Sequence, residues 1–195
     1  MTLAPPLLLG RARELELLEE LLDRAQRGRG GIALLLGEAG IGKSSLAEAL
    51  ATIAETRDVQ VVRGRALEFA SAPPYFPLWP CLRSLGIDPT EGFPNPFQLW
   101  ERVAEGLAQR SAARPTLWLL EDLHATDEQT LELLNFIGQP VRGLRALVLL
   151  TARPRDARLT ERATRLLTRI EREGSALTLA ALSLQQVKTL TERIA

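Results

Sequence analysis

One eight-residue stretch constrains the fold of this chain more than any other: residues 37–44, which read GEAGIGKS. The stretch fits the pattern G-x-x-x-x-G-K-[ST], which forms a phosphate-holding loop between a strand and a helix. The flanking sequence agrees with that context. Residues 32–36 (IALLL) are wholly apolar, as in a strand buried on both faces, and residues 45–55 carry apolar side chains at helical spacing. The sequence therefore predicts a strand, a glycine-rich loop and a helix in succession.

Each residue type in this loop has a chemical reason. Gly37, Gly40 and Gly42 would let backbone N–H groups approach phosphate oxygens, and the N-terminus of the next helix adds a favourable dipole. Lys43 would neutralise the β- and γ-phosphates, and the Ser44 hydroxyl would ligate Mg²⁺. Only two of the 24 basic Lys and Arg residues are lysines, and one of them stands here. The residues expected to bind ATP or ADP in this stretch are Gly37, Glu38, Ala39, Gly40, Ile41, Gly42, Lys43, Ser44 and Ser45.

The composition narrows the class of protein further. The 195 residues are 46% hydrophobic and 25% charged, which suits one folded domain with a sizeable core. The formal net charge is zero, so nothing favours a direct nucleic-acid contact. Cys81 is the single cysteine, which fits a reducing compartment, and the sequence shows neither a signal peptide nor an apolar stretch of membrane-spanning length. We therefore expect a cytoplasmic protein whose partner in this segment is a nucleotide, without membrane or nucleic-acid contact.

A second chemical feature follows the four apolar residues 117–120 (LWLL), which are succeeded directly by Glu121 and Asp122. Such a run predicts a buried strand with two acids at its carboxyl end, where open α/β sheets bind their ligands. One acid would hold Mg²⁺, often through water, and the other would polarise the water that attacks the γ-phosphate. The residue types alone leave open which acid has which role.

The other segments alternate between expected helices and strands. Amphipathic spacing predicts helices over 11–27, 97–107, 126–137 and 155–173, and short apolar runs predict strands over 59–64, 144–151 and 176–181. Seven of the twelve prolines lie between Pro73 and Pro96. We expect residues 66–96 to form an ordered excursion with one short helix at 78–85, either as a surface insertion with its own small core or as a binding surface. The alternation predicts a three-layer α/β domain on a parallel sheet.

Three stretches together resemble the STAND class of signal-transduction ATPases: residues 9–15 (LGRAREL), the glycine-rich loop, and residues 120–127 (LEDLHATD). Within that class, the likeness is to the ATPase module of large LuxR-type, MalT-like bacterial transcription regulators. The resemblance implies a P-loop NTPase fold with a five-stranded parallel sheet in the order 5-1-4-3-2. It also implies that Gly10 and Arg11 contact the adenine.

The same resemblance suggests roles at the strand ends. Glu121 stands where the family has an aspartate, and the alignment assigns Glu121 to Mg²⁺ and Asp122 to the activation of water. Thr151-Ala152-Arg153-Pro154 matches the family's Thr-x-Arg-Pro, which implies that Arg153 senses the γ-phosphate. The expected catalytic set is therefore Lys43, Glu121, Asp122 and Arg153, and the expected Mg²⁺ ligands are Ser44, Glu121 and Asp122.

The resemblance also implies domain boundaries. Residues 1–182 would form the ATPase core, with 1–30 as lead-in and first helix, and residues 183–195 would begin the helix of a truncated lid domain. Family members continue into further domains, so we expect the chain to be part of a longer protein. We expect the isolated chain to stay monomeric, whereas the longer protein would oligomerise with ATP.

Three functions fit these observations. The first is Mg²⁺-dependent ATP binding with slow hydrolysis, used as a signalling switch in a transcription-regulating protein. The second is an AAA-type ATPase in which turnover is itself the task, stimulated by a polymer or by assembly. The third is a scaffold that holds a nucleotide without useful hydrolysis, in which Asp122 would be dispensable.

Overall fold

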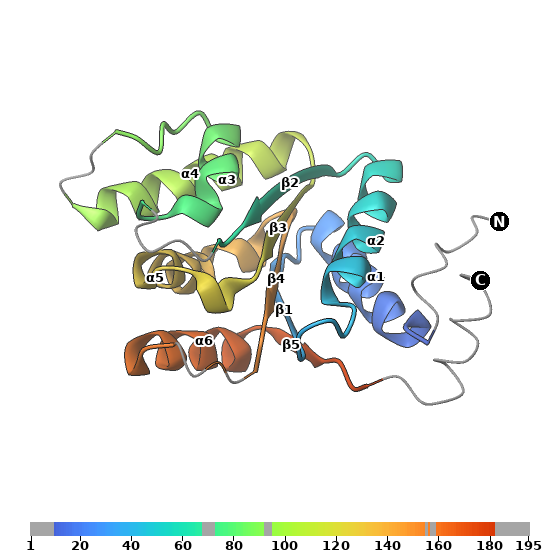
Figure 1. Ribbon diagram of the computed structural model, residues 1–195. Helices are drawn as coiled ribbons and strands as arrows, with labels where there is room; N and C mark the ends of the chain where they lie inside the picture. The colour runs from blue at the N-terminus through green and yellow to red at the C-terminus, as the bar shows by residue number, and fades with distance from the viewer. Residues whose placement is uncertain (1–9, 68–72, 92–94, 155, 157–158, 182–195) are drawn as a thin grey trace.

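The sheet of this protein has five parallel strands (Figure 1). The computed structural model describes residues 10–67, 73–91, 95–154, 156 and 159–181. The strands are β1 (Gly31–Leu36), β2 (Gln60–Arg65), β3 (Thr116–Glu121), β4 (Ala146–Ala152) and β5 (Ser175–Thr178). Their order across the sheet is β2-β3-β4-β1-β5. This is the predicted order 5-1-4-3-2 read from the other edge, so the fold prediction is confirmed.

Helices cover both faces of the sheet and complete three layers (Figure 1). One face packs against α1 (Ala12–Gln26) and α2 (Lys43–Thr56), and the other packs against α3 (Trp79–Ser84), α4 (Pro96–Ala113), α5 (Glu128–Ile137) and α6 (Glu161–Glu173). The alternation within β1 shows why this strand is apolar throughout. Ala33 and Leu35 face the α1–α2 layer, while Ile32, Leu34 and Leu36 face the other.

Within the described part of the chain the predicted elements exist, and several begin or end elsewhere for local reasons. Helix α6 begins at Glu161 rather than at residue 155, because the Thr160 hydroxyl accepts the N–H of Ala163 at 3.0 Å and caps the helix there. Helix α5 is capped by Asp127, whose Oδ1 accepts the N–H of Thr130 at 2.8 Å, rather than by Thr126. Strand β5 is shorter than predicted, since its pairing with β1 stops where β1 itself stops.

The described part of the proline-rich excursion packs onto the sheet and onto α5. It contains a short 3-10 helix (Phe76–Leu78) followed by α3, which confirms the predicted short helix, and Leu78 and Leu82 are buried in the core. A Cβ at Gly64 would lie 1.9 Å from the carbonyl oxygen of Pro77. Only glycine therefore permits β2 to lie this close to the 3-10 helix Phe76–Leu78. Residues 68–72 and 92–94 of the excursion lie outside the described residues, as do the expected lid helix from 183 and residues 1–9 of the lead-in.

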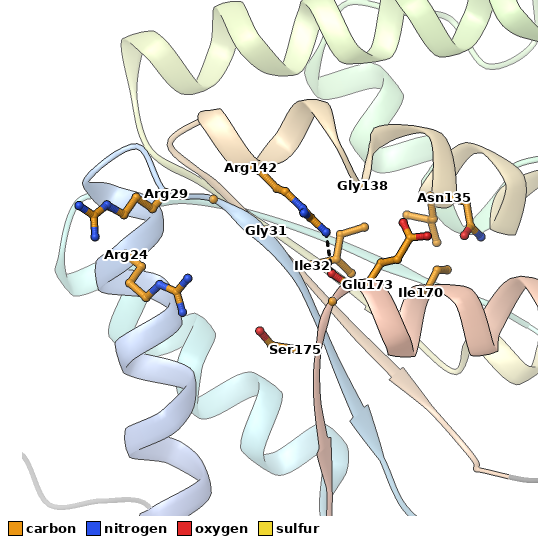
Figure 2. A pocket seen from close by; sticks show the side chains of 13 residues that line it. Arg24, Arg29, Gly31, Ile32, Asn135, Gly138, Arg142, Ile170, Glu173 and Ser175 are labelled. Carbon is orange, nitrogen blue, oxygen red and sulfur yellow. Dashed lines mark hydrogen bonds between the residues drawn. The ribbon is translucent and has the colours of Figure 1, made fainter.

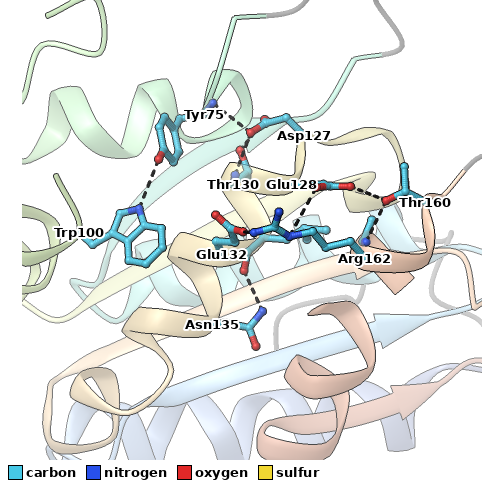
Figure 3. Close-up of polar contacts among 11 residues, drawn as sticks. Tyr75, Trp100, Asp127, Glu128, Thr130, Glu132, Asn135, Thr160 and Arg162 are labelled. Atoms are coloured by element: carbon cyan, nitrogen blue, oxygen red, sulfur yellow. Dashed lines mark hydrogen bonds and ion pairs between the residues drawn. The ribbon is translucent and has the colours of Figure 1, made fainter. Parts of the chain in front are cut away.

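Polar contacts join the excursion to the segment that follows the two acids (Figure 3). The N–H of Tyr75 donates to Asp127 Oδ1 at 3.4 Å, and Trp100 Nε1 donates to the Tyr75 hydroxyl at 3.3 Å. Tyr75 has a φ of 61°, in the left-handed region that is unfavourable for an aromatic residue. The first hydrogen bond holds this turn beside the start of α5, and the second joins it to α4. None of the helices formed by the described residues is long and apolar enough to cross a bilayer.

Candidate functional site

The carboxyl ends of the strands carry the residues that the sequence predicted. A cleft of about 320 Å³ opens there, and its lining combines the glycine-rich loop with strand ends: Ala39, Gly40, Gly42, Lys43, Ser44, Ser45, Arg65, Asp122 and Arg153. Loop residues and strand-end residues that lie up to about a hundred positions apart in the sequence therefore meet in one place. All of these except Arg65 were predicted from the sequence.

The loop has the backbone conformation that its glycines permit. Gly40 has a φ of 73° and Gly42 a φ of 99°, both in the left-handed region. A side chain at either position would be strained there. The turn at Gly42 starts α2 at Lys43, and the N–H of Leu46 donates to the Gly42 carbonyl at 3.0 Å as the first helical bond. The N-terminus of α2, with its unpaired N–H groups, therefore adjoins the cleft.

Lys43 is fastened to the loop that precedes it. Its side chain is largely enclosed, with only 7% of the residue exposed, and Nζ donates to the carbonyls of Gly37 and Glu38 at 2.7 and 2.9 Å. Burial lowers the pKa of the Lys43 ammonium; Asp122 and Glu38 act in the opposite direction, and Arg153 adds to the lowering. The ammonium is thus a preorganised cation that a bound anion would stabilise further.

Ser44 and Glu121 form the contact expected of a magnesium site. The Ser44 hydroxyl donates to the Glu121 carboxylate across the gap between α2 and β3. A hydroxyl and a carboxylate supply the oxygen ligands that Mg²⁺ prefers. Within the described ranges, no group of three or more His, Cys, Asp or Glu residues could hold a metal ion. Since Mg²⁺ is usually held by one or two carboxylates together with substrate phosphates and water, the pair of Ser44 and Glu121 still fits it.

Asp122 is held by partners on both neighbouring strands. It has a φ of 61°, and its N–H donates to the Thr151 hydroxyl oxygen on β4 at 3.0 Å. Its Oδ2 accepts from Arg65 Nε at 2.9 Å and forms an ion pair with the same guanidinium at 2.8 Å. Arg65 ends β2, directly opposite Glu121 in the register of β2 and β3. Sequence reasoning missed Arg65, although its place at the carboxyl end of a parallel strand was a usable signal.

Arg153 follows β4 and lines the same cleft. Its guanidinium lies 3.8 Å from the Asp156 carboxylate, and its side chain is 36% exposed. It lies near enough to Lys43 to influence the pKa of that lysine. The structure therefore places the predicted γ-phosphate sensor beside the predicted phosphate-binding lysine.

The Arg11 side chain lies against the glycine-rich loop and contacts a backbone carbonyl of the loop. The residue is 5% exposed, and its Nη2 donates to the carbonyls of Ile41 at 3.1 Å and Ala180 at 2.7 Å, while Nη1 pairs with Glu14 at 2.9 Å. Arg11 thus connects the start of α1, the glycine-rich loop and the segment after β5. Gly10 precedes it with a φ of 78°. The contact of Gly10 and Arg11 with adenine stays a prediction.

A separate hollow of about 410 Å³ lies at the amino ends of β1 and β5 (Figure 2). Arg142 there donates to the Glu173 carbonyl at 2.9 Å, at the carboxyl end of α6, and Arg24 lies in the last turn of α1. Arginines at these positions offset the negative ends of helix dipoles. None of the predicted site residues lines this hollow.

The fold and the loop together define a P-loop ATPase core. Residues 7–150 match the family model of the AAA ATPase domain. Because the match spans well over half of the sequence, the chain belongs to this family.

Solved structures with the same fold include replication initiators and a signalling ATPase. Cdc6p from Pyrobaculum aerophilum is 18% identical with a TM-score of 0.67, over 98% of this chain and 52% of that chain. AMPPCP-bound DnaA from Aquifex aeolicus is 16% identical with a TM-score of 0.56, over 95% and 50% of the two chains. A STAND protein with a tetratricopeptide repeat sensor from Pyrococcus horikoshii is 18% identical with a TM-score of 0.54, over 95% and 25%.

These similarities concern the fold. The chain spans about half the length of the two initiators and a quarter of the STAND protein. A comparison with curated protein sequences found no match.

Proposed function

We propose that this chain binds ATP with Mg²⁺ and hydrolyses it slowly, as the nucleotide switch of a larger signalling protein of the STAND class. The observation that carries the proposal is the convergence of Lys43, Ser44, Asp122 and Arg153 on one cleft. Glu121 adjoins this cleft, because its carboxylate accepts a hydrogen bond from the Ser44 hydroxyl. A loop that served only as a turn would need none of these charged groups beside it.

Each residue has a role that its geometry supports. The loop N–H groups and Lys43 bind the phosphates, and Ser44 and Glu121 hold Mg²⁺, which neutralises phosphate charge when bound. Asp122 polarises the attacking water, and Arg153 binds the γ-phosphate. Because Oδ2 of Asp122 is engaged by the Arg65 guanidinium, this oxygen must leave the ion pair before it can orient a water molecule. This engagement supports slow rather than rapid hydrolysis.

The signalling role rests on sequence likeness and on fold. The LGRAREL and LEDLHATD stretches resemble the ATPase modules of LuxR-type, MalT-like regulators, and a STAND protein shares the fold. In such a protein the γ-phosphate would shift the balance between a closed form and an assembling form. Arg11 supports this role, because it joins the loop to the segment after β5. We propose that the parent protein regulates transcription through domains outside this segment.

The decisive experiment is a binding titration combined with single-turnover phosphate release. Purified chain is titrated with ATP and ADP in the presence and absence of Mg²⁺, and Lys43→Ala serves as the control that lacks the phosphate-binding cation. The proposal expects Mg²⁺-dependent ATP binding and a hydrolysis rate that does not depend on protein concentration. Tight nucleotide retention with hydrolysis unaffected by Asp122→Asn would support the scaffold instead.

An AAA-type ATPase with turnover as its task is the second candidate, favoured by the family match and by the fold of the replication initiators. The same assay, repeated at several protein concentrations and with added DNA, separates it from the switch. A rate that rises steeply with protein concentration or with DNA, accompanied by ATP-dependent oligomers in light scattering, would move this candidate ahead.

A further inference from the structure

Thr151 makes a contact that the proposed mechanism leaves unused. It stands on β4 with none of its surface exposed, and its Oγ1 accepts the N–H of Asp122 at 3.0 Å. The paired registers of β3 and β4 run from Thr116 opposite Ala146 to Leu120 opposite Leu150. Asp122 therefore lies beyond the last paired residue, and a side-chain hydroxyl takes the place that a backbone carbonyl holds within the ladder.

The contact matters because of the conformation at Asp122. This residue has a φ of 61° and a ψ of 40°, in the left-handed region, and a residue with a side chain adopts it at a cost that surrounding contacts must offset. Two hydrogen bonds fix the peptide groups on either side. Thr151 accepts the N–H, and the Asp122 carbonyl accepts the N–H of Ala125 at 2.8 Å. Together they direct the carboxylate toward Arg65 and the cleft.

We propose that Thr151 is the positioning residue of Asp122, acting through its hydroxyl, and that it ties the catalytic acid to β4, the strand that leads into Arg153. The inference rests on the proposed function. Arg153 follows Thr151 by two residues, so a shift of this strand end on binding of the γ-phosphate would move Asp122 as well. The nucleotide state and the placement of the acid are then coupled through one buried hydroxyl.

The test compares variants that separate the hydroxyl from the volume of the side chain. Thr151→Val removes the hydroxyl with little change of shape, Thr151→Ser retains it, and Thr151→Ala replaces the valine variant if the latter does not fold. Thr116→Val is the matched control. Thr116 is another buried strand threonine, 2% exposed, whose hydroxyl donates to the Arg114 carbonyl at 3.1 Å at the opposite end of the sheet.

Three readouts decide the outcome: the single-turnover hydrolysis rate at saturating ATP, the ATP dissociation constant, and hydrogen exchange of the Asp122 amide followed by NMR. We expect Thr151→Val to slow hydrolysis by about tenfold or more, as loss of one well-placed hydrogen bond predicts. ATP affinity should change by less than about threefold, and the Asp122 amide should exchange about tenfold faster than in Thr116→Val. Thr151→Ser should restore the rate and the protection.

The proposal is overturned if Thr151→Val leaves the hydrolysis rate and the Asp122 amide unchanged, or if Thr151→Ser loses as much as Thr151→Val. In the second case the methyl packing, and not the hydroxyl, positions the acid. Absence of hydrolysis by the wild-type chain would instead contradict the hydrolytic part of the proposed function. The exchange of the Asp122 amide then still decides whether Thr151 holds this residue.

Discussion

Asp122 and Arg65 form an ion pair of 2.8 Å at the carboxyl ends of the neighbouring strands β3 and β2. The pair brings together a carboxylate that we predict to be catalytic and a guanidinium that lies 57 positions away in the sequence. The site therefore holds three cations, Lys43, Arg65 and Arg153, around its acids. Single substitutions at these positions separate phosphate binding from control of the acid.

Substitution of Arg65 should speed hydrolysis. Arg65→Ala frees the Asp122 carboxylate, and we expect a two- to fivefold faster single-turnover rate, because an exposed ion pair is worth about 1 kcal/mol or less. Since the Arg65 side chain is 61% exposed, the free energy of unfolding should change little. The matched control is Arg63→Ala on the same strand, since Arg63 pairs with Glu48 and Glu55 instead. An equal or slower rate in Arg65→Ala would contradict the expectation.

Lys43→Ala should weaken ATP binding by about tenfold to a hundredfold, because a charge-assisted contact worth roughly 1.5–3 kcal/mol is lost. Isothermal titration calorimetry measures the change. Arg172→Ala, on the exposed face of α6, controls for the loss of one positive charge. Unchanged affinity in Lys43→Ala would remove the phosphate-binding role of the loop.

The affinity for ATP should fall as the pH rises, beginning below the ordinary lysine pKa of 10.5, because burial lowers the pKa of Lys43 in the free protein. Bound phosphate favours the charged ammonium of Lys43. Above the lowered pKa the free protein has lost this proton, so ATP binding must take a proton up, and the affinity for ATP falls with each further pH unit. Titrations between about pH 7 and pH 10 test this range around the lysine pKa. The dependence should disappear in Lys43→Ala.

The two acids should give different phenotypes. Asp122→Asn should preserve ATP binding and lower the hydrolysis rate, and asparagine tolerates the left-handed conformation found at this position. Glu121→Gln should instead reduce the dependence of binding on Mg²⁺, because Glu121 contacts Ser44. Binding and phosphate release are measured for both variants across Mg²⁺ concentrations. If the phenotypes are exchanged, the assignment of the acids is reversed.

Arg11→Lys should destabilise the chain, although lysine retains the positive charge. One amine cannot reproduce the fork that bonds the carbonyls of Ile41 and Ala180 and the Glu14 carboxylate. We expect a loss of about 1.5–3 kcal/mol in the free energy of unfolding, as for hydrogen bonds to charged groups. Chemical denaturation measures it. Arg13→Lys, at the exposed neighbouring position on α1, should show no such loss.

The order of the elements and the chemistry of the loop could be read from local sequence. The run IALLL predicts a doubly buried strand, and the glycines at 40 and 42 adopt the left-handed conformations that the loop requires. The position of Glu121 and Asp122 after a buried strand was likewise visible, because parallel sheets collect ligands at one edge. The predicted boundaries of the elements were less accurate. Residues such as Thr160 and Asp127 cap their helices, but neighbouring residues could also have served as the N-cap.

The partners that hold the site together could not be read from the sequence. Thr151 bonds Asp122 across 29 positions, and Arg11 bonds Ala180 across 169. No local pattern distinguishes Arg65 or Arg11 from the many other arginines of this chain. Their roles arise because the parallel crossovers bring β2, β3 and β4 side by side and carry the segment after β5 back to the loop, so contacts between distant residues exist only once the sheet has formed.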